Sequence, residues 1–237
     1  MEPLIQLTNV SMTYGGNGAG THALRQVSFD IRTGEYAVIT GESGAGKSTL
    51  LAILGALQVP TEGKVRIRGV ELCGLGADAL ADVRRATIGF VFQAYHLLPY
   101  LTARENVMVP MSPARTAPRR KAERADELLA AVGLAGKEDR LPSQLSGGEC
   151  QRVAIARSLV HDPPVLLADE PTGNLDSVTG KQILDLFSEW HRRGKTILMV
   201  THNGAILDRA TRSIRLRDGR LEEDRGLGMH RAQTAAI

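Results

Sequence analysis

The sequence predicts an α/β protein in which a parallel sheet is joined by a small antiparallel β subdomain and an inserted helical subdomain. Three observations lead to this fold class. Several short apolar runs are continuous, which is typical of strands buried on both faces in a parallel sheet. Other segments alternate apolar with polar residues, as half-exposed antiparallel strands do. A long central stretch has no strand pattern and contains an amphipathic helical pattern instead.

The continuous apolar runs predict the strands of the parallel sheet. They are Tyr36–Thr40, Ile88–Phe92, Val165–Ala168 and Thr196–Thr201. Leu50–Leu57, a short distance after the first run, predicts a helix.

The alternating segments predict the smaller sheet. Residues 27–31 read Val-Ser-Phe-Asp-Ile, and residues 64–68 read Lys-Val-Arg-Ile-Arg. Each therefore presents its apolar side chains on one face only. Near the C-terminus, apolar residues on both sides of Asp218-Gly219 predict a closing hairpin, since this pair favours tight turns.

The central stretch between Gln93 and Asp162 predicts a helical insertion. Its amphipathic run Arg119–Val132 ends at Gly133, a suitable residue for a helix C-terminus. The arginines at the start of this run have no aromatic residues among them, so we interpret them as a solvated helix start.

The domain organisation follows from these patterns. We expect one domain over residues 1–224, with a core at 1–93 and 163–224 and a helical subdomain at 94–162. Residues 225–237 have no hydrophobic periodicity and predict a flexible tail.

Length and composition exclude several classes of protein. The chain has 237 residues, of which 43% are hydrophobic and 23% charged, so a disordered or fibrous protein is excluded. A net charge of +3 is too small to indicate a nucleic-acid partner. Cys73 and Cys150 are far apart, which argues against a disulfide framework or a zinc site. We see neither a secretory signal nor an apolar run long enough for a membrane helix, and we expect the chain in the cytoplasm.

A glycine-rich loop lies between the first buried strand and the following helix. Such a loop can turn its backbone N–H groups onto phosphates, with Lys47 reaching the β- and γ-phosphates and the Ser48 hydroxyl on Mg²⁺. The start of the next helix adds its positive dipole end. The predicted phosphate-binding residues are Gly41, Glu42, Ser43, Gly44, Ala45, Gly46, Lys47, Ser48 and Thr49.

Two adjacent acids follow the buried strand at Val165. In open α/β sheets, ligands bind at the carboxyl ends of the strands, where Asp169 and Glu170 stand. Beside a phosphate-binding loop, Asp169 would support Mg²⁺, and Glu170 would orient or deprotonate the attacking water.

A second anion site is predicted at Leu145-Ser146-Gly147-Gly148-Glu149, which precedes a helical pattern. If the helical insertion separates this segment from the glycine-rich loop, one nucleotide cannot easily reach both within one chain. We therefore expect Ser146, Gly147, Gly148 and Glu149 to act on the nucleotide of a neighbouring copy.

These motifs together resemble the ATP-binding subunit of an ABC transporter, over essentially Leu4 to Leu221. The loop at Gly41 matches the Walker A motif, the segment at Leu145 the signature and the strand ending in Asp169-Glu170 the Walker B motif. The resemblance implies ATP and Mg²⁺ as cofactors, and Glu170 and His202 as catalytic residues. It further implies that Tyr14 stacks on adenine and that Asp176 of the D-loop contacts the nucleotide. The metal ligands implied are Ser48, Gln93 and Asp169, of which Gln93 also contacts the nucleotide.

Within this family, the segments at Tyr95–Val107 and Pro142–Glu149 resemble the LolD/MacB type. Two positions depart from that type, Cys150 in place of glutamine and Asn203 in place of aspartate. The resemblance implies a head-to-tail dimer with a second copy, held at the inner face of the cell membrane by a permease of the LolC/LolE, MacB or FtsX-like type. Export, lipoprotein or lipid release, or cell-envelope mechanotransmission would be the function.

One alternative is a soluble ATPase of the same family that acts on nucleic acid or ribosomes. The family would then predict a coiled-coil insertion, a zinc hook or two tandem ATPase units, and the sequence contains none of them. A regulator that binds ATP without hydrolysis is a second alternative, against which Glu170 and His202 argue. The apolar stretch Tyr95–Leu101 predicts a partly exposed surface that could accept a short helix of a permease.

Overall fold

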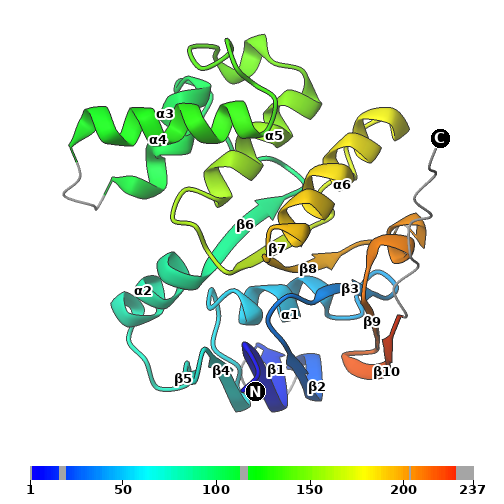
Figure 1. Ribbon diagram of the computed structural model, residues 1–237. Helices are drawn as coiled ribbons and strands as arrows, with labels where there is room; N and C mark the ends of the chain where they lie inside the picture. Colours follow the sequence, from blue (N-terminus) through cyan, green and yellow to red (C-terminus); the bar gives the residue numbers. More distant parts are fainter. Residues whose placement is uncertain (1, 16–19, 113–116, 203, 228–237) are drawn as a thin grey trace.

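The computed structural model describes residues 2–15, 20–112, 117–202 and 204–227. Its two sheets lie on either side of helix α1 (Lys47–Leu54), which contacts β2 of one sheet and β7 and β8 of the other (Figure 1). The helical insertion lies beyond β6 and β7, on the side opposite the smaller sheet (Figure 1). This arrangement confirms the predicted fold class.

The larger sheet has, within the described residues, six strands in the order β10-β9-β3-β8-β7-β6. Every pairing from β9 to β6 is parallel, and only β10 is antiparallel to its neighbour. The strands are β3 (Tyr36–Thr40), β6 (Ile88–Phe92), β7 (Val165–Asp169), β8 (Thr196–Val200), β9 (Arg212–Arg217) and β10 (Arg220–Gly226).

The central strands are apolar throughout because both faces of this sheet are covered. In β3, Tyr36 and Val38 pack into the hydrophobic core shared with the helical insertion and α6. Ala37 and Ile39 pack into the second core, toward α1 and the smaller sheet. This alternation between two cores explains the continuous apolar runs.

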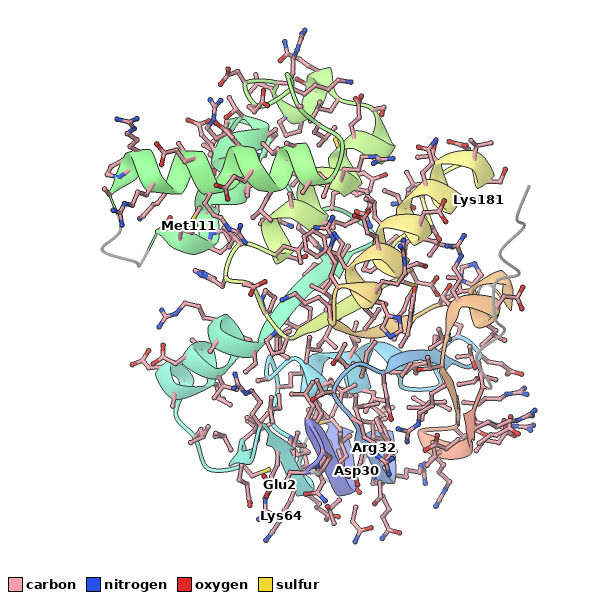
Figure 2. All side chains as sticks on the ribbon, viewed as in Figure 1. Glu2, Asp30, Arg32, Lys64, Met111 and Lys181 are labelled. Carbon is pink, nitrogen blue, oxygen red and sulfur yellow. The ribbon has the colours of Figure 1, made fainter. Side chains whose placement is uncertain are left out.

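The smaller sheet is antiparallel, and the described part of the chain gives it four strands in the order β2-β1-β4-β5. They are β1 (Ile5–Tyr14), β2 (Thr21–Ile31), β4 (Glu62–Ile67) and β5 (Val70–Glu71). One side of this sheet is remote from the helical insertion and carries the exposed side chains of Glu2, Asp30, Arg32 and Lys64 (Figure 2). Met111 lies in the insertion, at the other end of the molecule (Figure 2).

Between β6 and β7, all the regular structure in the described residues is helical. The insertion contains α3 (Ala103–Met108), η1 (Val109–Met111), α4 (Pro118–Ala131), η2 (Pro142–Gln144) and α5 (Gly147–Ser158). Helix α4 ends at Ala131, and Gly133, predicted as its C-terminal residue, follows the C-cap Val132 with a φ of 79°. The Gly133 N–H donates to Ala130 and the Leu134 N–H to Leu129, so both bonds of a Schellman motif are present.

The remaining helices are α2 (Ala77–Thr87), α6 (Ser177–Arg192) and η3 (Gly204–Arg209). The predicted tail differs from the structure at its start, because β10 continues through Gly226. Arg225 and Gly226 pair with Ser213 and Arg212 of β9, and backbone hydrogen bonds between strands need no hydrophobic periodicity. Residues 228–237 lie outside the described residues. Within the described ranges, no helix is both long and apolar enough to cross a membrane.

Candidate functional site

The glycine-rich loop lies between the end of β3 and the start of α1, as predicted. Gly41, Gly44 and Gly46 have φ values of 154°, 81° and 96°, a backbone region that favours glycine. A Cβ at Gly46 would lie 2.3 Å from the Ala23 carbonyl oxygen. The loop conformation therefore depends on glycine both for its dihedral angles and for its close packing on β2.

Lys47 bends its side chain back over this loop. Its Nζ donates to the carbonyl oxygens of Gly41 and Glu42, each at 2.8 Å. The lysine also lines a cavity of about 340 Å³ with residues of the loop, the acids Asp169 and Glu170, and β2. A cation and the N-terminus of α1 in one cavity favour a polyphosphate ligand.

The two acids stand at the end of β7, where both line this cavity. Burial, and then the neighbouring charge of Glu170, raise the pKa of Asp169, while Lys47 acts in the opposite direction. Glu170 has a φ of 45°, and its N–H donates to the Val200 carbonyl oxygen at 2.9 Å. Such a strained backbone is typical of functional positions.

Glu170 and His202, predicted separately as catalytic residues, are in direct contact. The Glu170 Oε1 and His202 Nδ1 atoms are 2.9 Å apart. The Glu170 side chain is 18% exposed and that of His202 is 77% exposed. The exposed histidine thus contacts a carboxylate that is itself mostly buried. Asn203, the second departure from the LolD/MacB pattern, lies outside the described residues.

Gln93 is not among the residues that line the phosphate cavity. Its Nε2 donates to Asn174 Oδ1 at 3.0 Å, and Asn174 Nδ2 donates back to the Gln93 carbonyl oxygen at 3.1 Å. A Cβ at Gly173 would lie 2.7 Å from Gln93 Nε2, so this glycine provides the space for the amide. The structure brings Ser48 and Asp169 into one cavity, but Gln93, which follows β6, bonds instead to Asn174 in the loop after β7.

Tyr14 ends β1 beside α1, outside the phosphate cavity. Its hydroxyl donates to Gln58 Oε1 at 2.6 Å and lies 3.5 Å from Thr49 Oγ1. The residue is 40% exposed. Its ring is therefore anchored at the hydroxyl and open to solvent elsewhere.

The signature segment forms the start of α5. The Ser146 Oγ accepts from the Glu149 N–H at 3.3 Å, and Glu149 Oε2 accepts from the Ser146 N–H at 2.8 Å, a capping box. An ion pair with Lys137 and the bond from Ser146 lower the pKa of Glu149. A Cβ at Gly148 would lie 2.3 Å from Thr179 Cγ2, so α5 packs closely on α6 here.

Asp176 is the N-cap of α6. Its Oδ1 accepts from the N–H groups of Val178 and Thr179, each at 3.0 Å, and the bonds from Thr179 lower its pKa. Cys150 is buried, and this burial raises the pKa of its thiol, which disfavours the thiolate.

The signature has a cavity of its own, of about 280 Å³, between the starts of α5 and α6. Its lining includes Ser146, Gly148 and Glu149 and shares no residue with the lining of the phosphate cavity. The two predicted anion sites of one chain are therefore separate.

Sequence reasoning missed one side of the phosphate cavity. Thr21, His22 and Ala23 of β2 line it together with the glycine-rich loop. The His22 Nδ1 is 2.9 Å from Thr13 Oγ1 of β1. No motif includes His22, which reaches the cavity because β2 packs on the glycine-rich loop beside Ala23.

Comparisons with known proteins agree with this geometry. The family model described as ABC transporter matches residues 24–173. An ABC transporter ATP-binding protein of Thermotoga maritima is 52% identical, over 96% of this chain and 98% of its own. The macrolide export ATP-binding/permease protein MacB of Hyphomonas neptunium is 47% identical over 94% of this chain. The match spans 35% of that longer protein.

A solved structure is similar over nearly the whole chain. The ATP-binding cassette MJ0796, as a dimer in a post-hydrolysis state bound to ADP and Pi, superposes with a TM-score of 0.87 and 42% identity. The alignment covers 94% of this chain and 98% of the cassette. None of these comparisons supports the soluble alternative. The chain belongs to the ABC transporter family, as an ATP-binding subunit that hydrolyses ATP.

Proposed function

We propose that this chain works as a head-to-tail dimer that binds two ATP molecules between its copies. Each ATP would lie on the glycine-rich loop of one copy and under Ser146–Glu149 of the other. The observation that carries this proposal is the separation of the two anion sites, whose cavities share no lining residue. The MJ0796 cassette, which is described as a dimer, is consistent with it.

The residues of the phosphate cavity fit a magnesium ion that shares its coordination with a nucleotide. Ser48 and Asp169 offer oxygen ligands there. Over the described ranges, no group of three or more His, Cys, Asp or Glu side chains could hold a metal alone. This suits Mg²⁺, which binds through few protein ligands plus substrate phosphates. When bound, the ion would neutralise charge on the β- and γ-phosphates. Gln93 would join Ser48 and Asp169 after leaving Asn174.

The chain's own groups would divide the hydrolytic work. Lys47 would exchange its two carbonyl acceptors for phosphate oxygens. Glu170 would accept a hydrogen bond from the attacking water. The contact with His202 would hold the Glu170 carboxylate in position. The exposed ring of Tyr14 would stack on adenine. Asp176 would remain a helix cap that fixes the loop at the dimer contact.

A membrane permease of the MacB type is the proposed partner, with LolC/LolE and FtsX-like permeases as relatives of the same kind. The chain would then be cytoplasmic and peripheral on the inner face of the membrane. Export of small molecules or peptides is the function that fits the MacB resemblance best. Lipoprotein or lipid release and cell-envelope mechanotransmission are the alternative functions of this type. The proposal involves no nucleic acid.

A groove between α2 and the helical insertion would accept the permease. It has a volume of about 530 Å³, and apolar side chains such as Phe90, Phe92 and Val109 contribute to its lining. The stretch Tyr95–Leu101 was expected to be this surface. Of this stretch, His96 lines the groove and Tyr100 is 73% exposed, while Leu97 is partly buried against the core.

The dimer is tested by the variant Glu170→Gln. Turnover should fall by on the order of a hundredfold, because the water loses its base while Asp169 and Lys47 remain. Light scattering should then detect an ATP-dependent dimer. Glu189→Gln, on the surface of α6, is the matched control and should behave as wild type. A Glu170→Gln chain that stays monomeric at saturating ATP contradicts the proposal.

A further inference from the structure

The backbone directly after Gln93 has an unusual conformation. Tyr95 and His96 are consecutive residues with φ values of 59° and 49°. Residues with a Cβ avoid this left-handed region, so two in succession require support from their surroundings. The Tyr95 N–H donates to the Phe92 carbonyl oxygen at 3.3 Å, which closes a turn with Gln93 and Ala94 at its centre. The position of Tyr95 therefore determines where Gln93 can be.

Arg157 of α5 supports this turn. Its Nη2 donates to the Tyr95 carbonyl oxygen at 2.6 Å, and its Nη1 donates to the next carbonyl oxygen, that of His96, at 2.5 Å. Burial lowers the pKa of Arg157, and hydrogen bonds to two carbonyl oxygens act against this effect by stabilising the cation. One planar guanidinium thus spans two adjacent carbonyl groups, which a lysine cannot reproduce.

The opposite end of α5 also contacts this turn. A Cβ at Gly147 would lie only 3.0 Å from the Tyr95 hydroxyl oxygen, so the ring packs against the first residue of the signature helix. Further along, Asn106 of α3 is fully buried and accepts from the Leu98 N–H at 2.7 Å. It also donates to the carbonyl oxygen of Leu101 at 2.9 Å. The chain from Tyr95 onward is therefore fastened to the helical insertion.

Gln93 itself is held from the other side. Its preceding residue Phe92 pairs with Asp169 in the sheet, and its amide bonds to Asn174 after β7. Only Ala94 separates Gln93 from Tyr95, which Arg157 of α5 holds. Where the chain passes from β6 into the insertion, Ala94 is thus the one residue between a part held by the sheet side and a part held by the insertion.

We propose that Arg157 is a positioning residue that fastens the turn after Gln93 to the signature helix, so that Gln93 and Ser146–Glu149 move together. A movement of α5 toward a neighbouring nucleotide then pulls Gln93 away from Asn174. This inference rests on the proposed role of Gln93 at the metal. Arg157, which belongs to no motif identified in the sequence, would thus couple Gln93 to the signature segment Ser146–Glu149.

A double-mutant cycle on the full chain tests the proposal. Arg157→Met should lower kcat by about tenfold and raise the Mg²⁺ concentration needed for half-maximal activity, because Gln93 is misplaced. In a Gln93→Ala background, the same substitution should change kcat by less than about twofold, because Arg157 acts through Gln93. Arg104→Met, which removes an insertion arginine bound to Asp126 and Asp139, is the control and should leave kcat near wild type.

Three results would overturn the proposal. The first is a tenfold loss that persists in the Gln93→Ala background, and the second is an equal loss in Arg104→Met. The third is wild-type activity of Gln93→Ala alone, which also removes Gln93 from the proposed metal site. If Arg157→Met does not fold, Arg157→Lys keeps the charge and the stem and should give a smaller loss of kcat that again disappears without Gln93.

Discussion

Substitutions at two glycines of the phosphate-binding loop, Gly44 and Gly46, should affect folding and ATP binding differently. Gly44 and Gly46 both have left-handed φ values, of 81° and 96°. A Cβ at Gly44 meets no atom within 4 Å, whereas a Cβ at Gly46 lies 2.3 Å from the Ala23 carbonyl oxygen. Gly44→Ala and Gly46→Ala are therefore a matched pair that differs in steric contact.

The expected magnitudes follow from these contacts. The left-handed backbone costs an alanine about 1 to 2 kcal/mol, which both variants share. Overpacking against β2 adds about 1 to 3 kcal/mol in Gly46→Ala only. Since 1 kcal/mol shifts Tm by roughly 2 to 4 °C in a domain of this size, Gly46→Ala should melt several degrees below Gly44→Ala.

Thermal unfolding and fluorescent-ATP binding together check this prediction. Gly44 lines the phosphate cavity, so its new methyl group should enter the space for phosphate and weaken ATP binding in a chain that remains folded. Equal melting temperatures for the two variants would refute the steric argument. Wild-type ATP affinity in Gly44→Ala would refute the assignment of the cavity.

Three further predictions concern other parts of the site. Tyr14→Phe should keep ATP affinity, while Tyr14→Ala should lose about 1 to 3 kcal/mol of binding free energy, as measured by calorimetry. The pKa of Glu149 is lower in the folded chain than in the unfolded chain, so its ionised carboxylate stabilises the fold above the unfolded pKa, and this stabilisation is lost as pH falls through the folded pKa. In urea titrations, Glu149→Gln should therefore unfold more easily than wild type at pH 7, and the difference in stability between the two should shrink below about pH 4. Ala81→Arg, in the groove, should reduce the fraction of the chain that sediments with membranes, with ATP affinity unchanged within about threefold.

Local patterns were sufficient to predict much of the fold. Strands β3 and β6 have the predicted bounds, and β7 and β8 differ from theirs by one residue. Strand β1 was missed because its alternation changes phase. Asn9 has a φ of 50°, and the pairing with both neighbours shifts register around it. Helix α1 begins at Lys47, earlier than predicted, because its first turn belongs to the phosphate-binding loop.

The contacts that join distant segments could not be predicted. Motifs indicated Glu170, His202 and Gln93 one by one, but the contact of Glu170 with His202 and that of Gln93 with Asn174 arise from the order of the strands. Likewise, His22 reaches the phosphate cavity because β2 packs on the glycine-rich loop, where the Ala23 carbonyl oxygen lies close to Gly46. Such contacts depend on tertiary packing, which no local spacing encodes.

A mixing experiment tests most directly whether the two anion sites act on each other's nucleotide. Lys47→Ala removes the phosphate contact, and Ser146→Arg blocks the signature. In a head-to-tail dimer, each site is formed by the glycine-rich loop of one copy and the signature of the other. When one copy carries Lys47→Ala and the other Ser146→Arg, one site therefore has both defects and the other site has neither. Each variant alone should be inactive, and an equal mixture should recover about a quarter of the wild-type hydrolysis rate, since half the dimers are mixed and each has one intact site. A mixture that forms mixed dimers, verified by affinity tags, yet stays as inactive as its components would contradict the account.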